Sequence, residues 1–365
     1  MSMKGGFDTA EKQEKVVVVG ISFNKMPADV EKALLEIESL CHTANLEVVG
    51  KAFQNIQEST PATLIGSGKV AEVLQIVKDS NADVVVLDTE LTGSQIKNLS
   101  DIWNVKVIDR SMLILDIFAG RAKTNEGRLQ VKLAQLKYTL PRISGYSGTS
   151  GRFGSAGVGM RGPGETKLEL DKRAIRENIF KLEKEIKKLK SQREVQKSNR
   201  KKNNVKMVAI VGYTNAGKST LMNTITKAGI YADDKLFATL DTTTRNVWLS
   251  NNRQIVLTDT VGFIDKLPHA FIEAFSATLE EAKDADLLLH VVDITDPNCK
   301  KQMEVVRKVL SELGASDIDT ILVYNKMDKN TTPFVMPEGV MCISARKNTG
   351  VEELKKEIER RLFEN

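Results

Sequence analysis

The chain has 365 residues, 41% hydrophobic and 28% charged, with a formal net charge of +5, which suits a folded protein of two or three domains. No apolar run approaches the roughly 20 residues that a membrane-spanning helix needs, so we expect no stable membrane insertion, and the charged N-terminus is unlike a secretory signal. Three cysteines lying far apart exclude a disulfide framework and a cysteine-based zinc site, and we expect a cytoplasmic monomer.

The first 110 residues alternate short apolar strands with helical patterns, beginning with the run Val16–Ile21. Helices are expected over Val30–Leu40 and around Val70–Val77. This alternation is typical of a small parallel α/β domain, which we assign to residues 1–110. The further strands are expected at Leu46–Val49, Val84–Leu87 and Val105–Ile108.

Two apolar seams with steps of three and four residues predict an antiparallel helical hairpin within residues 111–204. A glycine-rich segment at residues 145–164 is the expected tip loop of this hairpin, and the polar stretch Lys197–Lys206 is expected to be a linker. The seams are Leu129, Leu133, Leu136 and Leu140, followed by Ile175, Ile179, Leu182, Ile186 and Leu189.

Positive charge is concentrated in this middle region. Between Arg121 and Lys206 there are 23 Lys and Arg residues against 8 Asp and Glu residues, a net charge of +15. Such a concentration favours contact with a polyanion such as nucleic acid. The alternative is a solvated helical surface that is rich in lysine.

A phosphate-binding loop follows the apolar run Val208–Val211 and precedes a helical pattern, which is the context that the motif G-x-x-x-x-G-K-[ST] requires. Its backbone N–H groups should surround the phosphates at a helix N-terminus. Lys218 is expected to bridge the β- and γ-phosphates, and the Ser219 hydroxyl to bind Mg²⁺. The expected nucleotide contacts in this segment are Gly212, Tyr213, Thr214, Asn215, Ala216, Gly217, Lys218, Ser219 and Thr220.

Two later segments predict nucleotide-dependent switches. Asp259 ends a strand and is placed to hold Mg²⁺, and the Gly262 amide can sense the γ-phosphate. Thr239 is the expected switch threonine that completes Mg²⁺ coordination when GTP is bound, with Phe237 close by, although neighbouring threonines leave this choice open. The candidate catalytic residues are Lys218, Thr239 and Gly262, and the candidate Mg²⁺ ligands are Ser219, Thr239 and Asp259.

The last motifs select the base and define a P-loop GTPase domain at residues 205–365. Asn325-Lys326-Met327-Asp328 follows an apolar strand. The Asp328 carboxylate can accept both hydrogens on the N1/N2 edge of guanine, and the Lys326 stem can lie over the ring. A backbone amide of Ser344-Ala345-Arg346 would meet the guanine oxygen. The order and spacing of these motifs predict binding of GTP and GDP.

With these motifs, the whole chain resembles the HflX family of ribosome-associated GTPases. The residues that carry the resemblance are Phe237–Arg245, Asp259–Ile264, Arg161–Glu169 and Thr63–Val70. The resemblance implies binding to the large ribosomal subunit and its rRNA through the hairpin and the N-terminal domain, and dissociation or rescue of stalled or idle ribosomes. Thr242 stands where the family usually has proline, and some members continue into a further C-terminal domain.

Phe263 occupies the position at which many switch GTPases carry a water-orienting glutamine, so we predict slow GTP hydrolysis that a partner such as the ribosome stimulates. Asn215 lies where some related GTPases bind K⁺, and equal rates in K⁺ and Na⁺ would remove that hypothesis. Two alternatives stay open: a GTPase regulator that acts through protein partners in signalling or stress response, and an RNA-remodelling ATPase with GTP as regulator. For the latter, Gly66–Lys69 could contact ATP, although a turn that begins a helix is favoured.

Overall fold

The computed structural model describes residues 13–23, 27–143, 167–202, 205–226, 236–237, 239–240, 242–250, 253–265, 271, 281–330 and 339–364. The predicted tip loop at 145–164 lies outside these ranges. The chain divides into two compact units, Met1–Asp116 with Pro141–Leu170, and Ile117–Leu140 with Asp171–Asn365. The domain boundaries expected at residues 110 and 204 remain predictions.

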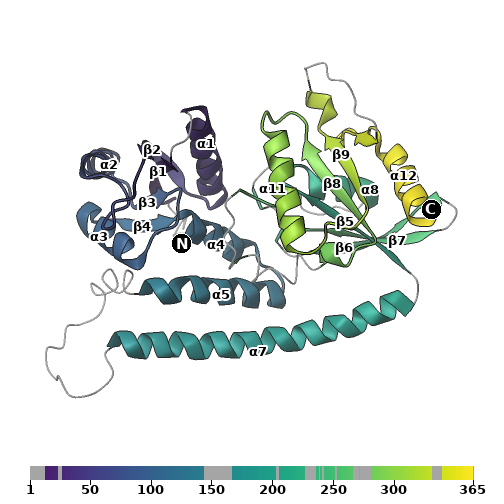
Figure 1. The fold of residues 1–365 in the computed structure, drawn as a ribbon, viewed down its shortest axis with the longest axis horizontal. Helices are drawn as coiled ribbons and strands as arrows, with labels where there is room; N and C mark the ends of the chain where they lie inside the picture. Colours follow the sequence, from purple (N-terminus) through teal and green to yellow (C-terminus); the bar gives the residue numbers. More distant parts are fainter. Residues whose placement is uncertain are drawn as a thin grey trace, which may run out of the picture. The chain divides into compact units, whose positions relative to one another are not determined.

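The first unit contains a four-stranded parallel sheet with the order β2-β1-β3-β4 (Figure 1). Val16 to Val19 of β1 are fully buried, as are all four residues of β3. Strands buried on both faces read as continuous apolar runs, which is why the sequence revealed them. The strands are β1 (Lys15–Phe23), β2 (Glu47–Ile56), β3 (Val84–Leu87) and β4 (Lys106–Asp109).

Helices α1 (Pro27–Thr43), α2 (Ser67–Ser80) and α3 (Gly93–Trp103) belong to the first unit, and α4 (Arg110–Arg121) passes from the first unit into the second. Helix α2 begins directly after its N-cap residue Gly66, as expected of a turn that begins a helix.

Helix α3 is an element that the hydrophobic pattern did not predict. It begins with a capping box, in which the Gln95 amide donates to Thr92 Oγ1 over 3.3 Å and the Thr92 amide donates to Gln95 Oε1 over 3.0 Å. The pair T-x-x-Q was the signal available in the sequence. The helix ends at Trp103, whose indole N–H donates to the Val70 carbonyl over 3.0 Å.

The second unit is built on a six-stranded sheet with the order β10-β9-β8-β5-β7-β6, parallel throughout except for β6, which runs antiparallel to β7. Helices α8 (Lys218–Thr226), α11 (Cys299–Glu312) and α12 (Val351–Phe363) belong to this unit. The predicted α/β fold with a P-loop nucleotide domain is therefore confirmed. The strands are β5 (Lys206–Gly212), β6 (Thr243–Trp248), β7 (Gln254–Asp259), β8 (Leu287–Asp293), β9 (Thr320–Asn325) and β10 (Val340–Cys342).

Helices α5 (Asn125–Thr139) and α7 (Lys167–Lys202) lie side by side and run antiparallel, as predicted (Figure 1). Lys137 Nζ lies 2.8 Å from Glu183 Oε1 and joins the two helices. The linker prediction was wrong for most of its length, because α7 continues to Lys202. Lysine and arginine are good helix formers, and no glycine or proline interrupts the stretch, so its polarity did not imply irregular structure. None of the helices in the described ranges is long and apolar enough to cross a membrane.

Replacing the α3 cap provides a test of local stability. Thr92→Ala should lower the free energy of unfolding of the first unit by about 1 kcal/mol, because it removes the hydroxyl that caps α3. Denaturant unfolding followed by Trp103 fluorescence measures this. The other of the two tryptophans is removed by Trp248→Phe in both proteins, so that Trp103 alone gives the signal. Thr92→Ser keeps the hydroxyl and should retain most of the stability, so equal loss in both variants would contradict the capping role.

Candidate functional site

The phosphate loop connects β5 to α8, and its backbone can adopt this path because of its small residues. Gly217 has φ +94°, and a Cβ there would overlap the side-chain amide of Asn325, so only glycine fits. Helix α8 begins at Lys218, so unpaired N–H groups of its first turn face the loop, as in other sites that bind phosphate. Asn215, expected beside the phosphates, is exposed and has φ 61°.

Lys218 is buried at the base of this loop, with 6% of its surface exposed. Its Nζ donates to the carbonyls of Gly212 and Tyr213 over 3.2 and 2.9 Å. Burial lowers the pKa of Lys218 to about 8, and the negative charge of Asp259 opposes that shift. Backbone oxygens thus hold the ammonium close to the loop. A phosphate bound there would favour its charged form, which burial disfavours.

Three oxygen atoms that were expected to hold a metal ion meet at one place. Ser219 Oγ lies 2.7 Å from Thr239 Oγ1 and donates to Asp259 Oδ2 over 2.7 Å. Thr239 Oγ1 also donates to Asp259 Oδ2, over 3.2 Å. Asp259 is fully buried, and its Oδ1 has no hydrogen-bond partner among the described residues. Burial raises the pKa of Asp259, although Lys218 and both hydroxyls act against this.

This donor set fits a hard divalent cation. Magnesium prefers oxygen ligands, and one carboxylate with one or two hydroxyls leaves room for phosphate oxygens and water. No group of three His, Cys, Asp or Glu side chains suited to a metal occurs in the described part of the chain. A soft-metal site is therefore not assembled there, whereas the Ser219, Thr239 and Asp259 cluster suits Mg²⁺ with a nucleotide.

The segment after Asp259 lies against the phosphate loop. The Thr214 amide donates to the Phe263 carbonyl over 2.8 Å, and the Phe263 amide donates to the Gly212 carbonyl over 3.1 Å. The Tyr213 hydroxyl accepts from the Asp265 amide over 2.8 Å. Phe263 is 1% exposed, so its ring packs in the interior and takes no part in hydrogen bonding. These contacts place Gly262 beside Lys218.

Asn325 joins the phosphate loop to the base-binding segments. Its Nδ2 donates to the Ala216 carbonyl over 2.9 Å, and its Oδ1 accepts from the Ala345 amide over 3.0 Å. The Ala345 amide is one of the three backbone amides, in Ser344-Ala345-Arg346, of which one was expected to meet the guanine oxygen, and it already has Asn325 as its partner. Arg346 is exposed.

Asp328 lies on the short 3₁₀ helix η4 (Met327–Lys329) and accepts a 2.7 Å hydrogen bond from Ser344 Oγ. This bond is the main cause that lowers the pKa of Asp328, so the carboxylate stays an acceptor at neutral pH. Lys326 has φ 65°, and its Nζ lies 2.7 Å from Asp293 Oδ2. Asp293 ends β8 and was missed from the sequence, although an aspartate at a strand end beside the other motifs was a usable signal.

Two aromatic contacts link Phe237 of the first switch segment, and Phe271 further along the chain, to helices α4 and α5 in the same unit. The rings of Phe118 and Phe237 lie 4.7 Å apart at 82°, and those of Tyr138 and Phe271 lie 5.8 Å apart at 60°. Phe237 is 2% exposed and has φ 53°, an unfavourable conformation for a bulky residue that the surrounding packing must hold. Thr242, which stands where proline is usual in the family that the sequence resembles, donates to Glu281 over 3.2 Å.

Comparisons with known proteins agree with this geometry. Three family models match: GTP-binding GTPase N-terminal over residues 31–119, GTP-binding GTPase Middle Region over 121–200, and 50S ribosome-binding GTPase over 207–326. A protein named GTPase HflX from Caldanaerobacter subterraneus subsp. tengcongensis is 50% identical over 359 residues, covering 98% of this chain and 82% of its own.

The same name belongs to a protein of Escherichia coli K12 that is 44% identical over 323 residues, covering 88% of this chain and 75% of its own. Among solved structures, that of SsGBP in complex with GDP aligns with a TM-score of 0.54 at 26% identity, covering 96% of this chain and 99% of its own. A GTP-binding protein of the archaeon Sulfolobus solfataricus, at 24% identity and a TM-score of 0.50, shares the fold.

The contact between Phe118 and Phe237 can be tested through the switch threonine. Phe118→Ala removes the ring that holds Phe237, two residues before Thr239, so we expect Thr239 to leave the Asp259 oxygen more often. The Mg²⁺ concentration that supports half-maximal GTP hydrolysis should rise about two- to tenfold, since an edge-to-face pair contributes about 0.5–1.5 kcal/mol. Phe118→Leu, which keeps much of the apolar volume, should give a smaller rise. An unchanged Mg²⁺ dependence in Phe118→Ala would refute this coupling.

Proposed function

The chain belongs to the HflX family of GTPases, and we propose that it uses GTP hydrolysis to bind the large ribosomal subunit and to dissociate or rescue stalled or idle ribosomes. GTP hydrolysis itself is the activity of this family. The ribosomal part of the proposal is supported by the description of the matching nucleotide-domain family as ribosome-binding, and by the charge of α7.

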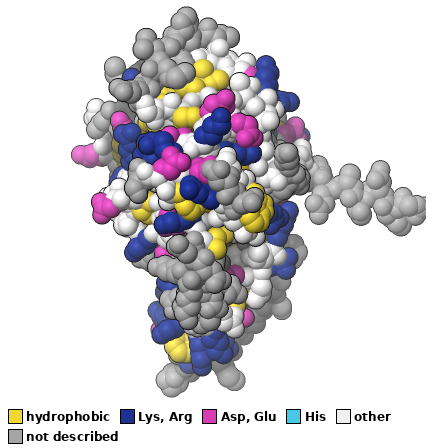
Figure 2. Space-filling model, turned by 90° about the vertical axis from the view of Figure 1, so that its right-hand side faces the viewer, with side chains coloured by type: hydrophobic (Ala, Val, Ile, Leu, Met, Phe, Trp, Pro, Cys, Tyr) yellow, Lys and Arg dark blue, Asp and Glu magenta, His cyan; other side chains and the backbone are white. Residues whose placement is uncertain are grey.

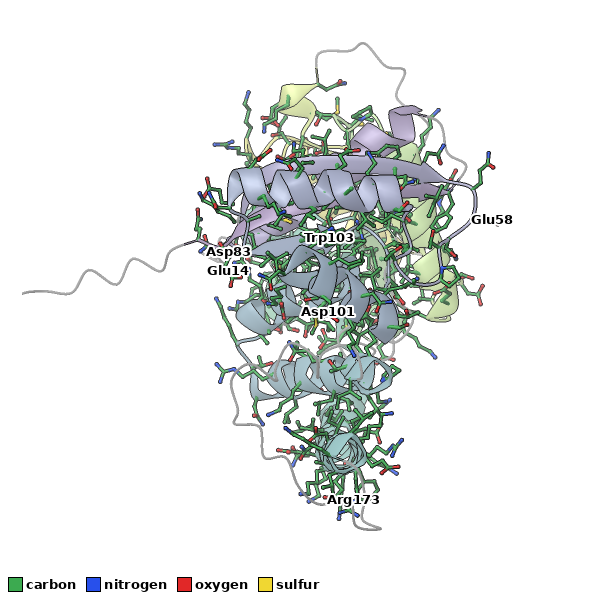
Figure 3. All side chains as sticks on the ribbon, turned by 90° about the vertical axis from the view of Figure 1, so that its left-hand side faces the viewer. Glu14, Glu58, Asp83, Asp101, Trp103 and Arg173 are labelled. Carbon is green, nitrogen blue, oxygen red and sulfur yellow. The ribbon has the colours of Figure 1, made fainter. Side chains whose placement is uncertain are left out.

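The proposal rests on one face of α7, which presents cationic side chains and an aromatic ring. Exposed side chains recur every three or four residues on this face; four of them are cationic, and the central one is the aromatic Phe180, with 68% of its surface exposed. Figure 3 views α7 nearly end-on and shows Arg173 on the side away from α5. The half-buried seam lies on another face of the same helix. The residues of this cationic face are Arg173, Arg176, Phe180, Lys184 and Lys187.

A face of this kind suits RNA better than a protein surface. Cations repeated along a straight helix can contact successive backbone phosphates, and the release of counterions then drives binding. An exposed aromatic ring among them can stack on an unpaired base. In Figure 2, Lys and Arg side chains are spread over the face in view, and several of them lie at its lower end. We therefore assign α7 to contact with ribosomal RNA.

The nucleotide site would act as the switch. The GTP γ-phosphate would recruit the Gly262 amide and hold Thr239 beside Ser219 and Asp259, and its loss would release both segments. Mg²⁺, held by Ser219, Thr239 and Asp259, would neutralise charge on the phosphates. Lys218 would bind the β- and γ-phosphates, and Asp328 would select guanine.

Ribosome-dependent turnover tests the proposal directly. GTP hydrolysis by the full chain should rise about tenfold or more when purified large ribosomal subunits are added, because Phe263 supplies no catalytic group of its own. Lys218→Ala provides the blank for contaminating GTPases. Tight GTP binding without stimulation would instead favour a GTPase that acts through protein partners.

Charge reversal on α7 distinguishes an effect of the cationic face from an effect of the net charge of the whole protein. The double variant Lys184→Glu with Lys187→Glu should weaken binding to large subunits at least tenfold. It should also reduce the slope of log K against log salt concentration, by about 0.7–0.9 for each phosphate that the helix no longer neutralises. Lys300→Glu with Lys308→Glu on α11 changes the net charge equally at exposed positions. Equal weakening by both pairs would show that only overall charge matters, and no weakening by either would remove α7 from the interface.

A further inference from the structure

Thr214 is a residue of the phosphate loop whose hydroxyl has no role in the fold. The residue is 6% exposed, and its Oγ1 lacks a hydrogen-bond partner among the described residues. A buried hydroxyl without a partner destabilises a protein, and native structures keep few of them. Such a group at a functional site indicates that a ligand completes it.

The position of Thr214 is fixed from two sides. Its amide donates to the Phe263 carbonyl over 2.8 Å, which binds the loop to the segment after Gly262. A Cβ placed on Gly262 would lie 2.9 Å from both Cα and Cγ2 of Thr214, and 3.0 Å from Lys218 Nζ. Thr214 and Lys218 therefore both lie directly against Gly262, and the Thr214 methyl group is the part of its side chain nearest to Gly262. Lys218 and the Gly262 amide are the groups assigned to the γ-phosphate, so the Thr214 side chain lies next to the phosphoryl group that is transferred.

The reaction lacks a water-positioning group at the usual place. Phe263 follows Gly262, and its buried ring can neither donate nor accept a hydrogen bond. A threonine hydroxyl can donate one hydrogen bond and accept two. It can thus accept a hydrogen bond from a water molecule while donating its own to a phosphoryl oxygen.

We propose that Thr214 is a catalytic residue, whose Oγ1 orients the attacking water against the γ-phosphorus of GTP. The water oxygen forms the new bond to phosphorus as the bond to the β,γ-bridging oxygen breaks, and the electron pair of that bond leaves with GDP. The proton lost by the water ends on an oxygen of the released phosphate, and Thr214 is unchanged. The proposal rests on the GTPase activity alone and not on the ribosomal role.

Two substitutions separate the hydroxyl from the shape of the side chain. Thr214→Val has the same shape without the hydroxyl, and Thr214→Ser has the hydroxyl without the methyl group. In single-turnover hydrolysis by the full chain without ribosomes, Thr214→Val should be slower by about 100-fold, the size of effect seen when one positioned hydrogen-bonding group is lost from a transition state. Thr214→Ser should recover most of that rate.

Binding measurements give a readout that is independent of turnover. GDP with aluminium fluoride imitates the transferring phosphoryl group and its water, whereas GDP alone does not. Thr214→Val should weaken the GDP–aluminium fluoride complex by a factor similar to the rate loss and leave GDP affinity within about twofold. In the absence of nucleotide the same variant should melt at a higher temperature, because it removes a buried hydroxyl without a partner.

Three results would overturn the proposal. Hydrolysis by Thr214→Val at the rate of the unchanged protein would show that the hydroxyl does nothing. Equal slowing in Thr214→Val and Thr214→Ser would assign the effect to side-chain shape. Equal weakening of GDP and of GDP with aluminium fluoride would assign it to the path of the phosphate loop.

Discussion

The side-chain amide of Asn325 is the interaction on which the nucleotide site depends. It is 2% exposed and bonds the Ala216 carbonyl on one side and the Ala345 amide on the other. Asn325 ends β9, and the groups that it binds follow β5 and β10, so the parallel sheet brings all three to one edge. One planar amide therefore sets the distance between the phosphate loop and the base loop. Loss of either bond would leave a buried backbone group unpaired, at a cost of about 1–3 kcal/mol.

A second constraint is the burial of two opposite charges, on Lys218 and Asp259, that influence each other electrostatically. Burial alone disfavours the charged forms of both Lys218 and Asp259, and each offsets part of that effect for the other. The Ser219 and Thr239 hydroxyls and the backbone carbonyls beside Lys218 supply further hydrogen bonds. Such a pair contributes little to stability by itself. Its consequence is a preorganised polar site that a phosphate and a cation can enter without large rearrangement.

The sequence predicted those parts of the site that residues close together along the chain encode. The phosphate loop and Asp259 lie at strand ends that short apolar runs reveal, so their placement in the fold followed from the pattern. Helix α3 was missed because its capping box is a weaker signal than periodicity. The contacts of Phe118 with Phe237 and of Lys326 with Asp293 join residues that are distant in sequence, and no local pattern encodes such pairs. The burial of the Thr214 hydroxyl likewise depends on where Phe263 folds back, which only the tertiary structure reveals.

The aromatic contacts of Phe237 and Phe271 have a thermodynamic consequence. They couple the first switch segment to α4, which carries Phe118, and Phe271 to α5, which carries Tyr138, within one compact unit. A ligand of α5 or α7 that disturbs these contacts must change the affinity for nucleotide, and by reciprocity the nucleotide must change the affinity for that ligand by the same factor. A ligand of the hairpin that acted in this way would be an allosteric effector, and its binding would change the ratio of GTP to GDP affinity, which can be measured without following hydrolysis.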